Sequence, residues 1–182
     1  MKAAGVLPVS INHQGKIVLL LGQETPFQDQ NNPNDELWCG FGGKTDQGET
    51  PEETAAREFE EESMALWMSK DEMLHILQTN YNQRLLDKHT DDIYQEFVVY
   101  FDYDERIPDQ FDRVLNYFQR CNKIQSICPE GHLEKSAVEW FTLDQIISGQ
   151  VDKVLRPTFL QMTLLSYPYI VDGIENFLKP ST

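Results

Sequence analysis

Short apolar runs bounded by turn residues open the chain, and they predict a pair of strands. The runs cover residues 3–11 and 16–22, and His13-Gln14-Gly15 between them is typical of a hairpin turn. The following segment, 23–36, is rich in Asn, Gln and Pro, which is typical of a loop. A short apolar segment broken by glycines follows at 37–44, and further strands are expected at 83–86, 93–103 and 136–141.

Apolar residues recur at helical spacing later in the chain. This spacing predicts an amphipathic helix over residues 108–121, with one apolar face made by Ile107, Phe111, Val114, Leu115 and Phe118. Other helices are expected at 70–77, after a cap at 142–144, and from Arg156 onward with an interruption at Pro168. Strands and helices alternate without βαβ regularity, which favours an α+β fold or an α/β/α sandwich with a mixed sheet.

The clearest helix start lies at Thr50. Thr50 suits the N-cap, Pro51 suits the first helical position, and Glu53 completes a capping box. We expect this helix to run to about Leu66. Its apolar face is expected to pack against the sheet through Ala55, Ala56, Phe59 and Leu66.

Three carboxylates share a face of this helix. At about 100° per residue, Glu58, Glu61 and Glu62 fall within an arc of roughly 100°. Like charges at this spacing cost a few tenths of a kcal/mol per pair, so bound cations would relieve the repulsion. Carboxylate oxygens are ligands that Mg²⁺ prefers. Taken alone, Glu60-Glu61-Glu62 also fits a solvated acidic face.

The overall charge narrows the classes of ligand. A net charge of −15 argues against broad attraction to nucleic acid, but cations held by acidic groups can bind a small phosphorylated substrate. No run approaches the ~20 apolar residues of a membrane helix, and no signal-peptide pattern opens the chain, so a cytoplasmic location is expected. Three cysteines without CxxC spacing predict neither a disulfide framework nor a zinc site.

The spacing around the acidic helix resembles the Nudix box, G-x5-E-x7-R-E-U-x-E-E-x-G-U. The residues in register are Gly43, Glu49, Arg57, Glu58, Phe59, Glu61 and Glu62. Met64 stands where the pattern has its last glycine, a departure that bears on the helix ending and not on the metal site. The segment 37–44 is similar to the W-x-G-F-G-G-K sequence of several MutT-type nucleotide hydrolases, and 139–146 resembles the late strand and helix start of that fold.

This resemblance covers about residues 3–150 and implies the Nudix α/β/α sandwich. The whole chain, 1–182, is then a single Nudix hydrolase domain. It carries a helical insertion at 106–128 and a C-terminal helical extension at 156–182.

The resemblance also implies roles for individual residues. The metal, Mg²⁺ or Mn²⁺, would be held by Glu58, Glu61, Glu62 and the carbonyl of Gly43. Water would be oriented or deprotonated by Glu58 or Glu61, with Glu134 on a loop as a further catalytic candidate or a solvent-exposed residue. A salt bridge from Arg57 would brace Glu49.

The candidates for substrate binding are less specific. Lys44 is either a phosphate contact or a solvated lysine. Phe27 and Trp38 are positioned to stack on a base, and Cys39 occupies a position that can face it. A thiol reads base edges poorly, which weakens recognition of an oxidised purine.

The implied function is Mg²⁺-dependent cleavage of a phosphoanhydride bond in a nucleoside diphosphate-linked substrate, such as a nucleoside triphosphate. Alternatives are hydrolysis of dinucleoside polyphosphates, nucleotide sugars or diphosphoinositol polyphosphates, and mRNA decapping through a local basic patch around Lys70, Arg84, Lys88 and His89. A nucleotide-sensing binding module is the non-enzymatic alternative. The expected partner is a small phosphorylated molecule, with nucleic acid only if capped RNA is the substrate, no membrane, and a monomer or homodimer as the assembly.

Overall fold

A seven-stranded mixed sheet forms the centre of the computed structural model, which describes residues 2–25, 36–79, 84–87, 93–120 and 131–177. The central strand is β1 (Lys2–Ile11), which pairs in parallel with β6 (Ile93–Tyr100) along one edge. The remaining strands are β2 (Ile17–Glu24), β3 (Trp38–Cys39), β4 (Phe41–Lys44), β5 (Arg84–Asp87) and β7 (Lys135–Thr142).

The sheet divides into two branches at the other edge of β1. The first half of β1 pairs with β4, from Ala3 to Val6, whereas the second half pairs with β2, from Val9 to Ile11. β2 then carries β3 and β7. β3 pairs with β2 and β4 pairs with β1, so Gly40, which joins β3 to β4, connects the two branches.

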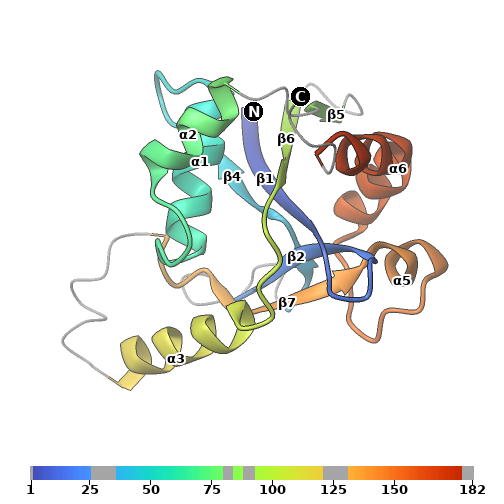
Figure 1. Ribbon diagram of the computed structural model, residues 1–182. Coiled ribbons are helices and arrows are strands. Elements are labelled where there is room, and N and C mark those ends of the chain that lie inside the picture. Colours follow the sequence, from blue (N-terminus) through green and yellow to red (C-terminus); the bar gives the residue numbers. More distant parts are fainter. Residues whose placement is uncertain (1, 26–35, 80–83, 88–92, 121–130, 178–182) are drawn as a thin grey trace.

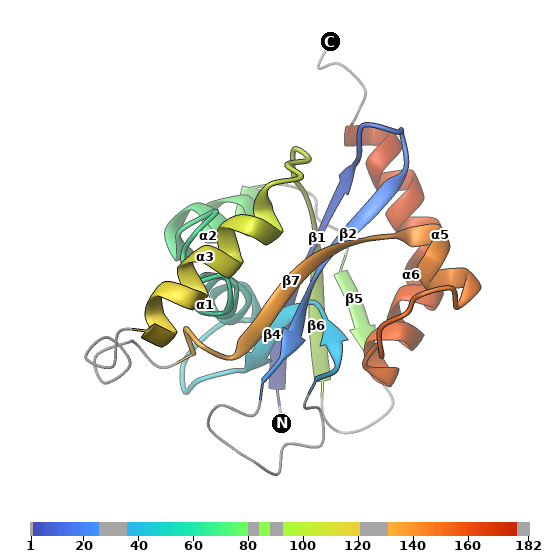
Figure 2. The ribbon, with the colours of Figure 1, turned by 90° about the horizontal axis from the view of Figure 1, so that it is seen from below.

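Helices cover both faces of the sheet (Figure 1, Figure 2). One face carries α1 (Pro51–Glu62), α2 (Lys70–Thr79) and α3 (Ile107–Arg120), and the opposite face carries α5 (Leu143–Ser148) and α6 (Pro157–Phe177). Each layer encloses its own buried apolar cluster. The expected α/β/α sandwich with a mixed sheet is thereby confirmed.

The local elements agree well with the sequence prediction. The N-terminal hairpin, the helix at α2 and the amphipathic helix at α3 are present. Phe111 and Leu115 of α3 are buried in the cluster on the α1 face, so this helix belongs to the core. That it is an insertion within the domain, and that α6 is an extension, stay predictions.

The expected break at Pro168 is wrong, because α6 continues through it. Proline removes one helical hydrogen bond, but Pro168 and Leu164, whose carbonyl loses its partner, are both exposed, so water can replace the bond. Ile170 and Ile174, beyond the proline, keep the same helix packed in the core. None of the helices in the described ranges combines the length and apolar character needed to span a bilayer.

Helix α1 begins as predicted and ends early. The side chain of Thr50 accepts from the backbone N–H of Glu53, whose carboxylate accepts from the N–H of Thr50. The expected end at Leu66 is wrong, since the helix stops at Glu62. Met64 and Ala65 have positive φ angles of 55° and 53°, a left-handed conformation that reverses the chain. Met64, which stands where the Nudix pattern has glycine, therefore adopts the left-handed conformation that glycine favours.

Replacing Ala65 by glycine is expected to stabilise the protein. A left-handed conformation costs a residue with a Cβ roughly 1–2 kcal/mol, and the greater freedom of glycine in the unfolded chain offsets about 0.4–1 kcal/mol of that gain. Ala65 is exposed, so little packing is lost. We expect Ala65→Gly to raise the melting temperature by about 1–2 °C in a calorimetric scan.

Met64→Gly is the matched comparison, because it relieves the same backbone conformation. Met64 is only 7% exposed and packs in the core, so this change also removes a buried side chain. We expect a net loss of about 1–2 kcal/mol and a lower melting temperature. If Ala65→Gly lowered the melting temperature as well, backbone strain at this helix end would be refuted.

Candidate active site

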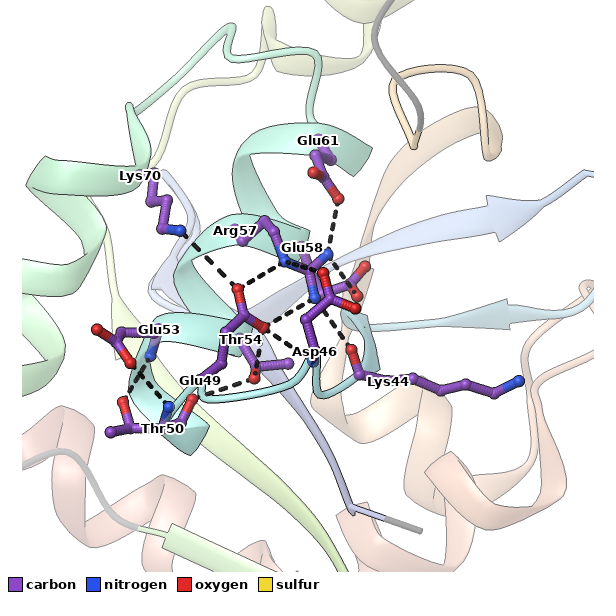
Figure 3. Close-up of polar contacts among 10 residues, drawn as sticks. All are labelled: Lys44, Asp46, Glu49, Thr50, Glu53, Thr54, Arg57, Glu58, Glu61 and Lys70. Carbon is purple, nitrogen blue, oxygen red and sulfur yellow. Dashed lines mark hydrogen bonds and ion pairs between the residues drawn. The ribbon is translucent and has the colours of Figure 1, made fainter.

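One guanidinium organises acidic side chains of α1 and of the loop that precedes it (Figure 3). Arg57 donates from Nε and Nη2 to the two oxygens of Glu49, at 2.9 and 3.1 Å. Its Nη1 donates to Glu58 Oε1 and to Glu61 Oε2, both at 2.9 Å. Nη2 also donates to the backbone carbonyl of Lys44 at 3.0 Å. A single side chain thus fixes three carboxylates and the end of β4.

Glu49 is held by several donors besides Arg57. The hydroxyl of Thr54 donates to its Oε2 at 3.0 Å, and the backbone N–H of Asp46 donates to the same oxygen at 3.2 Å. These hydrogen bonds, that from Arg57 foremost, lower the pKa of Glu49. Glu49 is therefore a stable anion that positions Arg57, which agrees with the bracing contact expected from the sequence.

Glu58 lies directly against Gly43 of β4. A Cβ at position 43 would come within 2.4 Å of Glu58 Oε1, so only glycine leaves room for this carboxylate. Burial raises the pKa of Glu58 to about 7, although Arg57 opposes the shift, and the charges of Glu61 and Glu134 add to it. Arg57 thus offsets only part of the cost of burying the charge of Glu58. The carboxylate lies next to the backbone of Gly43, and Glu134 is close enough to affect its pKa.

Glu61 lies between Arg57 and the turn that precedes β7. Gly131 of this turn has a φ of +87°, and a Cβ there would lie 2.8 Å from Glu61 Oε2. The same turn carries Glu134, whose backbone N–H donates to the carbonyl of Gly131 at 3.3 Å. The turn therefore brings Glu134 close to the acidic group on α1, and its catalytic role stays a prediction.

Glu62 points away from this group. It is 2% exposed, its Oε2 accepts from the backbone N–H of Gly42 at 2.7 Å, and its Oε1 lies 3.0 Å from Lys135 Nζ. Burial raises the pKa of Glu62 to about 8, against the opposing charge of Lys135. The three carboxylates that share one face of the helix therefore have different partners. Glu58 and Glu61 bind Arg57, whereas Glu62 binds Lys135.

Lys135 and Glu24 form a buried ion pair that was not expected from the sequence. Lys135 is fully buried at the start of β7, and its Nζ lies 2.8 Å from Glu24 Oε1 at the end of β2. The thiol of Cys39 donates to the same oxygen at 3.1 Å. Lysine in a strand normally indicates an exposed position. Glu24 and Lys135 come together because β2 pairs with β7, and that pairing could not be read from the sequence.

The candidate substrate-binding residues are scattered. Trp38 is 3% exposed and lies edge-to-face against Phe141 at 5.2 Å, and Cys39 is 6% exposed, with burial raising its pKa to about 12. Lys44 is exposed, and its side chain extends away from the carboxylates in Figure 3. Phe27 lies outside the described residues. Their roles in substrate binding stay predictions.

The fit of a divalent metal can be judged from these contacts. Among the residues described, no three side chains of His, Cys, Asp or Glu are already arranged as a metal site, because Arg57 and Lys135 hold the carboxylates. The cluster around Arg57 nevertheless has three glutamates for one guanidinium, and the ammonium of Lys70 lies farther away, 3.9 Å from Glu49. Glu58, Glu61 and the adjacent backbone at Gly43 therefore form a group of oxygen ligands with excess negative charge, which suits Mg²⁺ or Mn²⁺.

The fold is an α/β/α sandwich, and its candidate functional groups come from one glutamate-bearing helix and a glycine-rich strand. A model of the NUDIX domain matches residues 1–161, and the chain belongs to this family. The family assignment supports a pyrophosphohydrolase, and binding of metal and nucleotide is typical of the family. No curated protein matches the sequence.

Solved structures share the fold at low sequence identity. The Nudix domain of NrtR from Shewanella oneidensis, complexed with ADP ribose, is 16% identical, with a TM-score of 0.56 and coverage of 93% of this chain and 88% of that chain. An Ap4A hydrolase from C. elegans is also 16% identical, with a TM-score of 0.54 and coverage of 93% and 98%. A mutT/nudix family protein from Listeria innocua is 14% identical, with a TM-score of 0.54 and coverage of 95% of both chains.

Arg57→Lys is expected to destabilise the protein. An ammonium cannot reproduce the forked hydrogen bonds of a guanidinium, so Glu58 or Glu61 would lose its donor in a partly buried place. We expect a loss of about 1–2 kcal/mol and a melting temperature lower by about 5 °C. Arg106→Lys is the control, because Arg106 is 74% exposed and its guanidinium pairs with Asp104 at 2.7 Å, away from the acidic helix. An equal loss in both variants would contradict the organising role of Arg57.

A buried carboxyl on β6 predicts a pH dependence of stability. Glu96 is 2% exposed, and burial raises its pKa to about 7. Between the unfolded pKa near 4.3 and this value, the folded state holds a proton that the unfolded state releases. Stability is therefore lost as the pH rises from about 4.5 to 7.

Glu96→Gln removes this titration while keeping the shape of the side chain. We expect the variant to melt higher than the parent at pH 8, by several degrees, and to match it more closely at pH 5. Melting curves across this range test the prediction. A parent and variant whose difference does not change with pH would rule out the buried titration.

Proposed function

We propose that this chain is a Mg²⁺- or Mn²⁺-dependent hydrolase that cleaves a phosphoanhydride bond in a nucleoside diphosphate-linked substrate. The observation that carries the proposal is the pair Glu58 and Glu61, joined through Arg57 Nη1 beside the glycine backbone of β4. A divalent metal bound there would polarise phosphate oxygens and assist activation of water.

The residues of the chain supply position and charge for this chemistry. Glu58 and Glu61 present carboxylate oxygens from one helix face, and the backbone at Gly43 approaches them without a side chain. Glu134 adds a third carboxylate within electrostatic reach of Glu58, which suits a group that orients or deprotonates the attacking water. The hydrogen bonds of Arg57 keep these groups in place between turnovers.

A small nucleotide is the substrate class best supported. The crystallised Nudix proteins with this fold include one complexed with ADP ribose and an Ap4A hydrolase. The net charge of −15 disfavours a long RNA, which needs a basic track. Of the basic patch considered for capped RNA, Lys88 and His89 lie outside the described residues. A cytoplasmic location and a monomer or homodimer stay predictions.

Glu61→Gln is expected to abolish metal-dependent turnover while the protein stays folded. The change removes one negative charge but keeps the size of the side chain, which is 23% exposed. We expect kcat to fall by at least about 100-fold, or 2.7 kcal/mol in the barrier, with a melting temperature close to that of the parent. The measurement is release of phosphorylated product in the presence of Mg²⁺ or Mn²⁺, identified by mass.

Glu60→Gln is the matched control, since Glu60 is the neighbouring glutamate and its Oε1 accepts from the backbone N–H of Lys70, outside the acidic site. It should turn over like the parent. The substrates to compare are nucleoside triphosphates, dinucleoside polyphosphates, nucleotide sugars, capped RNA and diphosphoinositols. Retained turnover in Glu61→Gln would refute the catalytic assignment, and nucleotide binding without any turnover by the parent would favour a sensing module.

A further inference from the structure

We propose that the ammonium of Lys135 is the resident cation of Glu62, so that Glu62 does not coordinate the catalytic metal. The metal site of the proposed function would then be confined to Glu58, Glu61 and the backbone at Gly43. This inference deepens the proposed function and rests on it. It concerns which carboxylates of α1 remain available to an added cation.

The surroundings of Lys135 form a complete site for an ammonium group. An ammonium has three hydrogen-bond donors, and three acceptors surround Nζ: Glu24 Oε1 at 2.8 Å, Glu62 Oε1 at 3.0 Å and Cys39 Sγ at 3.7 Å. The side chain is 0% exposed. Its stem passes over Gly22, where a Cβ would lie 2.9 Å from Lys135 Cδ. Glycine in β2 thus makes room for this lysine.

Both oxygens of Glu62 are already used. One faces Lys135 and the other accepts from the backbone N–H of Gly42, and the side chain is 2% exposed. A metal bound by Glu62 would have to displace a buried lysine from its three acceptors. Glu58 and Glu61 differ, because their side chains are 10% and 23% exposed and each meets Arg57 through one oxygen.

Charge balance separates the two clusters in the same way. In the cluster around Lys135, two carboxylates, Glu24 and Glu62, face two cations, since Arg156 Nη1 lies 3.8 Å from Glu24. In the cluster around Arg57, three glutamates face Arg57 and the more distant Lys70. With all of these side chains ionised, the positive and negative charges of the first cluster balance, whereas the second keeps a net negative charge. An added divalent cation is therefore attracted to the second cluster.

The first test measures binding of Mn²⁺ without turnover. Free Mn²⁺ is followed by electron paramagnetic resonance during titration of the parent, Glu61→Gln and Glu62→Gln. We expect Glu61→Gln to weaken binding by at least about tenfold and Glu62→Gln to change it by less than about twofold. Equal weakening in the two variants would overturn the inference while leaving a metal site in place.

The second test removes the internal cation. Lys135→Met keeps most of the apolar stem and leaves Glu24 and Glu62 with one cation fewer in a buried place. We expect this variant to melt lower than the parent and to recover at least half of the loss when 1 mM Mn²⁺ is added, because the metal takes the vacated place. The control is Lys153→Met, whose lysine is 36% exposed and 3.4 Å from Glu139. It loses the same charge and should gain no stability from Mn²⁺ beyond that of the parent.

The outcomes separate this inference from the proposed function. No Mn²⁺ binding by the parent would contradict the proposed function, and stabilisation of Lys135→Met by Mn²⁺ would still support the role of Lys135. A Lys135→Met variant that gains no more from Mn²⁺ than Lys153→Met overturns that role. If Lys135→Met yields no folded protein, the comparison of Glu62→Gln with Glu61→Gln decides alone.

Discussion

The structure depends on one constraint, which is that carboxylates withdrawn from water need a cation or several hydrogen-bond donors. Five glutamates meet this need around two basic side chains. Arg57 on α1 serves Glu49, Glu58 and Glu61, and Lys135 on β7 serves Glu24 and Glu62. Of the glutamates of α1, Glu58 and Glu61 turn toward Arg57, and Glu62 turns toward Lys135. The proposed chemistry of the site depends on this pairing of Glu58 and Glu61 with Arg57 and of Glu62 with Lys135.

Residues from both branches of the sheet contact the glutamates of α1. Helix α1 packs through Ala55, Ala56 and Phe59, all at most 1% exposed, and this packing brings its acidic edge to β4. Gly42 and Gly43 allow close approach there, one by donating to Glu62 and one by leaving room for Glu58. β2 and β7 belong to the other branch and carry Glu24 and Lys135 to the same region. The packing of α1 on the sheet thus determines which charged side chains its glutamates can reach.

Local chemistry made much of this predictable from the sequence. The capping box at Thr50 and the apolar periodicity of α3 depend on neighbours in the chain, and both elements appear where they were expected. The direction of Glu62 was not predictable, because helical geometry gives the position of a side chain and not its partner. That partner arrives from β7, in a network that joins residues 111 positions apart. The early end of α1 was missed for a different reason, since Met64 adopts a glycine-like conformation without glycine.

The central claim is that α1 offers Glu58 and Glu61 to a metal and keeps Glu62 for Lys135. A crystal of the protein soaked in Mn²⁺, with anomalous diffraction data, tests it most directly. The account predicts an anomalous peak at coordination distance from oxygens of Glu58 and Glu61, about 2.0–2.3 Å, with Lys135 Nζ still bound to Glu62. A peak coordinated by Glu62, with Lys135 displaced from it, would contradict the account.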